Sequence, residues 1–392
     1  MFSWNGLHRG IKAIFFIQIV NRMGDFVIPF LTLILTQVQG MKPAEAGLVV
    51  SLATALGSAG GLLAGRLSDF LSRRDVLLCF LGASGLLLAF AGFAPASLGA
   101  LVAIVASEFF VGAMRPTLGA LVADLSDPSS HRAAFSLSYL GINLGVAVGP
   151  LLAGWLFQHS VNWLFWLDAI STGAALILLV RFVPRRSSVP SRDSTSSVAL
   201  STLLQFFRHP VLFPFSLLML VYNLVYSQMI FTLALQLVAL FGEQGPPAFG
   251  LVWAVNAVAV LAFTPLAFRA TRTWTNLIAM AWGLFFLAVG TSVFLFGPDL
   301  MGVLASALLW TAGEVLVSIH YGELVTAHSP PEVRGRFQAY VGFLGSLGFV
   351  ASPLASGLVT QELGLAGVWA SATILAVGVG CGLAFLGRRA TL

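Results

Sequence analysis

Residues 132–157 read RAAFSLSYLGINLGVAVGPLLAGWLF, and about 200 positions later residues 334–359 read RGRFQAYVGFLGSLGFVASPLASGLV. The two stretches match at an Arg and a Phe near their starts and, with one residue of slippage, at a Gly, a Pro-Leu pair and a further Gly. The matching pairs are Arg132 and Arg334, Phe135 and Phe337, Gly145 and Gly348, Pro150 and Pro353, Leu151 and Leu354, and Gly154 and Gly357. A repeat with this period predicts two related halves built from the same set of elements.

The composition places these halves in a membrane. Hydrophobic residues make up 58% of the 392 residues and charged residues only 9%, too little polar surface for a soluble protein of this size. A spanning helix needs about 20 apolar residues, and the pattern yields twelve such segments. They are predicted at 11–35, 45–66, 75–94, 98–121, 134–157, 162–182, 211–238, 248–268, 275–296, 300–325, 337–359 and 366–387. We therefore expect an all-α polytopic membrane protein with two pseudo-symmetric six-helix bundles.

The repeat and the spans together predict the domain organisation. Residues 1–182 form the N-terminal bundle, residues 183–210 a cytoplasmic linker, and residues 211–392 the C-terminal bundle. The linker begins with VPRRSSVPSRDSTSSVALS, a composition rich in Ser, Pro and Arg that is typical of flexible connections.

The basic residues predict the orientation. They fall in every second connection between spans, and the remaining connections contain Lys42 as their one Lys or Arg. The positive-inside rule therefore places both termini in the cytoplasm. We expect a bacterial inner membrane location. The net charge of +5 follows from this bias, and its scattered residues give no basis for a nucleic-acid partner.

The sequence predicts no cofactor, metal site or enzyme active site. Cys79 and Cys381 lie in apolar runs without metal-ligand spacing, and no phosphate-binding GxxxxGK[ST] loop is present. The expected partners are a small-molecule substrate, protons and membrane lipid, and the expected state is a monomer.

A loop motif follows the second span. Residues 65–78 read GRLSDFLSRRDVLL, which resembles the loop signature of the major facilitator superfamily, with Ser72 where a second Gly is usual. The matching residues are Gly65, Leu67, Asp69, Arg73 and Arg74, and Asp124 occupies the place where relatives hold a loop arginine. Gly65 would allow close helix approach, and Asp69 would cap a helix terminus while pairing with Arg73. The resemblance implies a latch on the cytoplasmic side; charges that only mark the loop are the alternative.

The fifth span carries a second motif. Residues 141–154 read GINLGVAVGPLLAG, which resembles the antiporter signature of the same superfamily. Gly145 and Gly149 belong to one small-residue face, and Pro150 would free a backbone carbonyl and bend the helix. In relatives this face seals the cytoplasmic half and accompanies export in exchange for protons. Ordinary packing of small residues is the alternative.

The fourth span departs from the family pattern. The superfamily normally has an arginine four residues before a glycine there, whereas here Glu108 precedes Gly112. Proton coupling therefore cannot be carried over from relatives on that signature, and a carboxyl group takes the arginine's position.

Ionisable residues within spans each cost roughly 2.5–3.5 kcal/mol on insertion scales and usually face a cavity or a partner. Arg22 and Asp25 are three residues apart and can share a helix face, and Glu108 and Arg115 lie two turns apart on one stripe. The resemblance implies that the first and fourth spans line a central cavity. Asp25 and Glu108 are then the proton acceptors, while Arg22 and Arg115 tune them or bind an anionic group. A permanently charged network that fixes helix register is the alternative.

The second half offers a different set of residues. Glu314 lies four residues past Trp310 on span ten, so both can point to the same side as a proton or substrate site. On span seven, Tyr222 and Tyr226 are one turn apart and can stack on an amphipathic ligand. Hydrogen bonds to that ligand would come from Asn223 and Gln228, or these amides would join helices to one another.

These features predict a secondary transporter that exports a small amphipathic molecule in exchange for protons by alternating access. Two alternatives stay within transport: a facilitator or proton symporter for a sugar, peptide or organic anion, and a lysolipid flippase. A membrane receptor that does not transport is a remote alternative.

Overall fold

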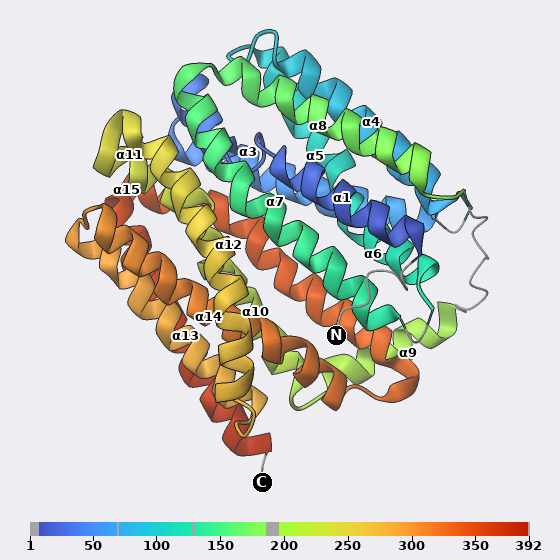
Figure 1. Cartoon of the computed structure of the whole chain (residues 1–392). Helices are drawn as coiled ribbons and strands as arrows, with labels where there is room; N and C mark the ends of the chain where they lie inside the picture. The colour runs from blue at the N-terminus through green and yellow to red at the C-terminus, as the bar shows by residue number, and fades with distance from the viewer. Residues whose placement is uncertain (1–7, 69, 128–129, 186–195, 391–392) are drawn as a thin grey trace. The chain divides into compact units, whose positions relative to one another are not determined.

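The computed structural model describes residues 8–68, 70–127, 130–185 and 196–390, and these ranges contain helices and no strand. The longer helices before the linker are α1 (Arg9–Met23), α3 (Pro43–Leu67), α4 (Arg73–Ala91), α5 (Leu98–Val111), α6 (Met114–Leu125), α7 (His131–His159) and α8 (Val161–Phe182). Those after it are α9 (Ser196–Phe207), α10 (Leu212–Tyr226), α11 (Phe231–Phe241), α12 (Gly245–Ala270), α13 (Asn276–Ser292), α14 (Leu300–His328) and α15 (Arg334–Ala390). The all-α prediction is confirmed (Figure 1).

The number of crossings agrees with the sequence. Within the described residues, nine helical segments are long and apolar enough to cross a membrane. Two of them, Leu212–Ala270 and Arg334–Arg388, are 59 and 55 residues long, which is enough for two crossings each. The first predicted span is not among the nine because its helix is interrupted, and with it the twelve spans are accounted for.

Two of the long segments change direction at identifiable residues. In α15 the backbone turns at Gly364, which has φ 71° and ψ 179°; only glycine adopts that conformation readily. In the segment that holds α11 and α12, Gly242 has φ 57°. Both glycines lie between predicted spans, where the chain has to reverse.

The chain divides into two compact units. The first comprises Met1–Met41, Leu52–Ser191 and Glu243–Ala257, and the second Lys42–Ser51, Arg192–Gly242 and Val258–Leu392. The unit boundaries therefore fall inside α3 and α12. The six-helix domains at 1–182 and 211–392 stay a prediction.

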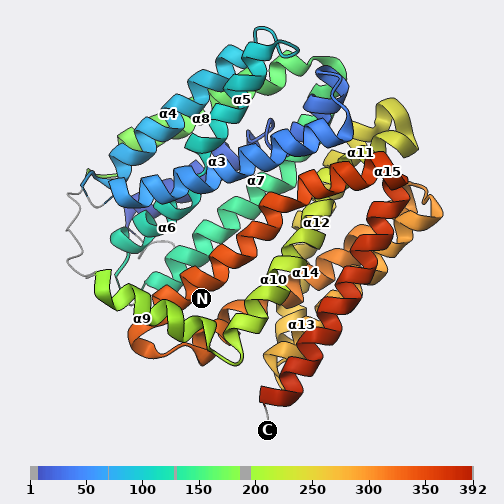
Figure 2. The ribbon, with the colours of Figure 1, turned by 180° about the vertical axis from the view of Figure 1, so that it is seen from behind.

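In the first unit, α1 packs beside α7 and α8, and α4 packs beside α5 and α8 (Figure 1). The shared interior is apolar. Its buried residues include Ile14, Ile17, Leu77, Leu118, Leu137 and Leu179. In the second unit, α15 packs along α10 and α13, and α13 along α14 (Figure 2). Trp310 and Trp369 are its largest fully buried side chains.

The sequence repeat reappears as equivalent contacts in the two units. A Cβ on Gly154 of α7 would lie 2.8 Å from the carbonyl oxygen of Pro246, at the start of α12. On Gly357 of α15, the repeat partner of Gly154, it would lie 2.4 Å from the carbonyl oxygen of Pro43, at the start of α3. Each glycine thus allows the first turn of another helix to approach its backbone closely.

The predicted linker contains a helix that was not expected from the sequence. Helix α9 spans Ser196–Phe207, inside the range expected to be flexible. Its Phe206 is 1% exposed, and the ring packs on Phe337 at 5.6 Å and on Tyr340 at 5.3 Å between centroids. The whole range was predicted to be flexible because residues 183–195 are rich in Ser, Pro and Arg, although apolar residues follow them.

Candidate functional site

The first span is interrupted at the charged residues. Helix α1 ends at Met23, and the chain becomes helical again only at Leu31. A Cβ on Gly24 would lie 2.0 Å from Oγ of Ser171 on α8, so only glycine fits there. Pro29 disfavours helix for the residue before it. The prediction of one continuous helix over 11–35 is therefore wrong at 24–30.

This interruption changes the expected geometry of the first charged pair. Nη1 of Arg22 lies 2.7 Å from Oδ2 of Asp25, and both side chains are less than one-fifth exposed. The pair was expected on one helix face, but Asp25 lies past the end of α1. The ion pair therefore joins the last turn of the helix to the unwound segment.

A carboxyl group from α8 completes this segment. Oδ2 of Asp168 accepts hydrogen bonds from the backbone N–H groups of Phe26, at 3.1 Å, and of Val27, at 3.2 Å. Asp168 is 5% exposed. The unwound backbone has lost the helical partners of its amides, and such buried groups need other acceptors. Asp168 supplies one for two of them.

The fourth span, Leu98–Leu125, contributes Glu108. Helix α5 ends at Val111 and α6 begins at Met114, but Gly112 and Ala113 between them keep right-handed helical backbone angles. The shared stripe of Glu108 and Arg115 stays a prediction. Glu108 interacts electrostatically with Asp25, Asp168 and Arg22. Its Oε1 is inaccessible to solvent and has no hydrogen-bond partner among the described residues. The side chain of Arg115 lies outside the described part of the structure.

The charged cluster is therefore defined by Arg22, Asp25, Glu108 and Asp168, all in the first unit. It contains three carboxyl groups and one guanidinium. Asp168 was not predicted, although the rule that identified the other three applies equally to an aspartate within the span 162–182. Within the described ranges no three such groups are arranged to hold a metal ion together.

The glycine face of α7 packs directly behind this cluster. A Cβ on Gly145 would lie 2.6 Å from Cβ of Arg22, and one on Gly149 would lie 2.8 Å from the carbonyl oxygen of Arg22. The predicted small-residue face is therefore a packing surface for the end of α1. Pro150 follows one residue later, inside an α7 that continues to His159.

A second group of predicted residues meets in the second unit. The rings of Tyr222 and Tyr226 stack on each other, with centroids 5.9 Å apart and planes at 27°. Tyr226 also meets Trp310 edge to face at 6.3 Å, and Glu314 interacts electrostatically with Tyr222. The two tyrosines therefore contact each other, and Trp310 is fully buried. This aromatic cluster brings together residues of α10 and α14.

The two amides of span seven join helices to one another. Nδ2 of Asn223 donates to the carbonyl oxygen of Gly345 at 3.0 Å. Nε2 of Gln228 donates to Oγ of Ser352 at 2.8 Å, and its Oε1 accepts from the Thr232 hydroxyl. Of the two interpretations that the sequence left open for these amides, the observed contacts match helix-to-helix bonding.

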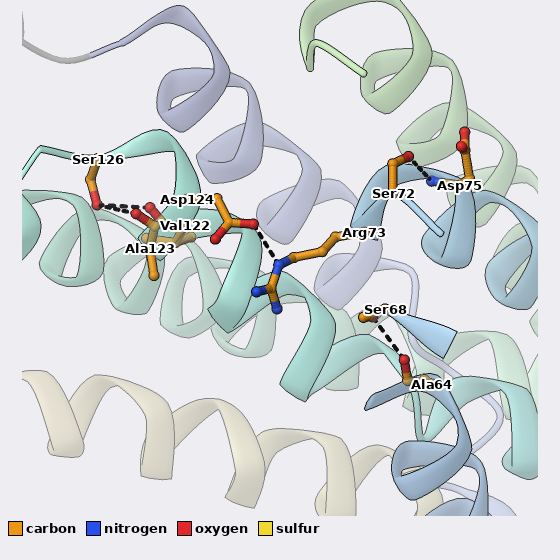
Figure 3. A network of polar contacts seen from close by, with 9 residues as sticks. All are labelled: Ala64, Ser68, Ser72, Arg73, Asp75, Val122, Ala123, Asp124 and Ser126. Atoms are coloured by element: carbon orange, nitrogen blue, oxygen red, sulfur yellow. Dashed lines mark hydrogen bonds and ion pairs between the residues drawn. The ribbon is translucent and has the colours of Figure 1, made fainter. Parts of the chain in front are cut away.

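The loop motif forms its contacts within the first unit (Figure 3). Nε of Arg73 bonds to Oδ2 of Asp124, whereas Asp69, its expected partner, lies outside the described residues. Arg74 donates to the carbonyl oxygens of Val183 and Val180, at 2.8 and 3.0 Å, and so caps the end of α8. Oγ of Ser72, the residue that replaces the usual Gly, accepts from the Asp75 N–H at the start of α4.

The expectation for Gly65 is not met. A Cβ at this position would have no neighbour within 4 Å among the described residues. Close helix approach in this unit occurs earlier on α3, where a Cβ on Gly60 would lie 1.6 Å from the carbonyl oxygen of Phe109 and one on Gly57 would lie 3.2 Å from that of Glu108. Sequence spacing alone does not distinguish which glycine of a helix faces a neighbour.

Comparison with known proteins identifies the family. Residues 14–353 match the model of the Major Facilitator Superfamily. The chain belongs to this superfamily, and it is a membrane transporter rather than an enzyme. It is 26% identical over 377 residues to the uncharacterized MFS-type transporter YqjV of Bacillus subtilis, a match that covers 93% of this chain and 89% of that protein.

Solved structures share the fold. A POT family transporter crystallised with 5-aminolevulinic acid has a TM-score of 0.82 at 15% identity, and the match covers 100% of this chain and 98% of that one. The nucleoside transporter NupG has a TM-score of 0.80 at 13% identity, with 96% and 98% covered. At identities this low, the similarity shows a shared fold and does not indicate a shared substrate.

Proposed function

We propose that this protein is a proton-coupled transporter that exports a small amphipathic molecule by alternating access. The observation that carries the proposal is the charged cluster, in which three carboxyl groups and the guanidinium of Arg22 meet where the first span is unwound. We further propose that both termini face the cytoplasm and that the membrane is the bacterial inner membrane.

The charge balance of the cluster supports a proton as the coupling ion. Arg22, the one guanidinium of the charged cluster, already pairs with Asp25 at 2.7 Å. Glu108 and Asp168 therefore have no second cation within the cluster. Uncompensated charge is costly inside a protein, and neighbouring carboxyl groups share protons for that reason. Glu108, whose Oε1 has no hydrogen-bond partner among the described residues, is the acid best suited to accept and release one.

The packing of α7 supports export. The glycine face resembles the antiporter signature, and it lies against the residue that pairs with Asp25. A change in the position of Arg22 would therefore alter the packing of α7, the helix that carries the signature. The aromatic cluster would hold the apolar part of the substrate in this proposal, with Glu314 as a second acid.

One observation favours a second candidate, proton symport of a zwitterionic solute. Arg22 and Asp25 present opposite charges 2.7 Å apart, a pair that could bind the two ends of an amino acid or short peptide. The fold is also shared with peptide transporters, although that likeness does not extend to substrate. The direction of coupled flux separates the two candidates.

The test is transport in proteoliposomes with an imposed pH gradient. A thermal-shift screen with dialanine, uridine and ethidium first selects a ligand, and flux of that ligand is then followed with and without a protonophore. Export predicts uphill movement against the proton flow, and symport predicts movement with it. Flux that the protonophore leaves unchanged would exclude both.

A variant assigns the coupling to the cluster. Glu108→Gln keeps the shape of the side chain but cannot release a proton. We expect it to reduce gradient-driven flux by about 100-fold, within the range measured for loss of a proton-transferring group, while ligand exchange without a gradient continues. Glu362→Gln, at an exposed position, is the matched control and should transport normally. Gradient-driven flux retained in Glu108→Gln would remove this residue from the mechanism.

A further inference from the structure

We propose that Asp168 is a positioning residue of the transport cycle: its carboxylate holds the unwound segment 24–30 and thereby keeps Asp25 beside Arg22 and Glu108. The consequence for coupling rests on the proposed function, whereas the contact between α8 and the segment does not. Asp168 itself need touch neither substrate nor proton in this role.

The segment needs such a support because its backbone is buried without helical bonds. Phe26 is 4% and Val27 is 0% exposed. The N–H of Phe26 bonds to the carbonyl oxygen of Gly24 at 3.0 Å as well as to Asp168, while the N–H of Val27 bonds to Asp168 at 3.2 Å. A buried amide without an acceptor costs about 1–3 kcal/mol, so removal of the Asp168 carboxylate would free the segment to rearrange.

The support comes from a rigid element. Asp168 lies in the N-terminal half of α8, which packs on both α1 and α4. Ser171, one turn further on, donates to the Asp168 carbonyl oxygen at 2.9 Å and occupies the space where Gly24 would carry a Cβ. Two residues of one helix face therefore fix the start of the unwound segment, and Asp25 lies between the points that they contact.

The charge and the hydrogen-bonding geometry of Asp168 can be separated. Asp168 interacts electrostatically with Asp25 and Arg22, but the bond of Arg22 is to Asp25. Asp168→Asn keeps an oxygen that can accept both backbone bonds and removes the charge. Asp168→Ala removes both. A positioning role predicts that the Asn variant holds the segment 24–30 as the native protein does and that the Ala variant does not.

Hydrogen–deuterium exchange of the purified full chain in nanodiscs tests this without a substrate. We expect Asp168→Ala to accelerate exchange in peptides covering 24–33 by about tenfold, as expected for the loss of local protection, and Asp168→Asn to change it less than about threefold. Peptides of α10 and α13 should be unaffected. Unchanged exchange at 24–33 in Asp168→Ala, or equal acceleration in Asp168→Asn, would overturn the proposal.

A second variant covers the case in which Asp168→Ala does not fold. Gly24→Ala places a Cβ against Ser171 and should separate the segment from α8 while the carboxylate stays intact. Faster exchange at 24–33 supports the proposal that α8 holds the unwound segment, and native exchange there overturns it. If the wild-type protein shows no gradient-driven flux, the proposed function is wrong. The hydrogen–deuterium exchange results still test separately whether Asp168 positions the unwound segment.

Discussion

Arg22 is fixed from two sides. Its guanidinium bonds to Asp25 across the end of α1, and its Cβ and carbonyl group lie against the glycine face of α7. A charged side chain on a helix end would otherwise sample many rotamers, and both contacts restrict it. The position of the cation in the charged cluster therefore depends on residues that carry no charge.

This dependence can be tested at Gly145. Alanine there would place a Cβ 2.6 Å from Cβ of Arg22, and such overpacking costs about 1–3 kcal/mol. We expect Gly145→Ala to lower the apparent unfolding temperature in detergent by several degrees and to reduce coupled flux. The matched control is Gly173→Ala on α8, where a Cβ would meet nothing within 4 Å. Alanine in place of this helical glycine gains up to about 1 kcal/mol.

Scanning fluorimetry of both variants beside the native protein measures the difference. Gly145→Ala with native stability and native flux would mean that α1 and α7 separate at no cost and that the glycine face of α7 does not restrain Arg22.

At the scale of elements, the unwound segment of the first span explains what the sequence could and could not predict. Hydropathy over 11–35 identified a membrane-crossing segment, and it does so regardless of whether the helix is continuous. Gly24 and Pro29 are the local signals of an interruption, but each also occurs in unbroken spans. The partner of the free amides, Asp168, lies more than 140 positions along the chain, which no local pattern reveals.

The same limit applies to the other predicted side chains. Sequence spacing correctly grouped Tyr222 with Tyr226 because both lie on one helix. It could not decide that Gln228 bonds to Ser352, since that contact joins two helices. Residues related by a helical turn were therefore predictable, whereas contacts between helices required the structure.

Helix α10 begins with a titratable cap. Nδ1 of His209 accepts from the N–H groups of Val211, at 3.2 Å, and Leu212, at 3.1 Å, so this nitrogen must be unprotonated. Burial lowers the pKa of His209 below its ordinary value, and charge repulsion from His328 acts in the same direction, against a hydrogen bond to the backbone of His328. The neutral form is therefore the one that the folded state prefers.

The sign of the pH dependence follows. In the unfolded chain His209 takes up a proton near its ordinary pKa of about 6.5, whereas the folded chain resists protonation to a lower pH. Stability contributed by the cap is thus complete above about pH 6.5 and falls as the pH drops below it, until the lowered folded pKa is reached. We expect the unfolding temperature of the native protein to decrease from pH 7.5 to 5.5.

His209→Asn should flatten this dependence, because asparagine caps a helix without titrating, and His209→Ala should lose about 1 kcal/mol at neutral pH. His159→Asn, at an exposed histidine near the end of α7, is the control and should keep the native slope. A His209→Asn protein with that same slope would show that another group is responsible.

At the scale of the whole molecule, the repeat is more than a sequence relationship. Gly154 and Gly357 occupy equivalent places in α7 and α15, and each receives the first turn of a helix, α12 or α3, that begins within its own unit. The units therefore share a packing rule as well as a sequence pattern. A duplication with six spans per half also gives both halves the same orientation in the membrane, because an even number of crossings returns the chain to the same side.

This parity makes the topology testable at corresponding loops. The positive-inside rule predicts that the connections before α3 and α12 face outward and those before α7 and α13 face the cytoplasm. In a background with Cys79 and Cys381 replaced by serine, single cysteines are introduced at exposed positions as Lys42→Cys, Glu243→Cys, Asp127→Cys and Thr273→Cys. A membrane-impermeant maleimide added to intact cells should label the first two strongly. The other two should react only after the membrane is permeabilised, which also controls for their intrinsic reactivity.

Labelling of Lys42→Cys without Glu243→Cys would contradict the even-crossing duplication, and labelling of Asp127→Cys and Thr273→Cys in intact cells would place both termini outside.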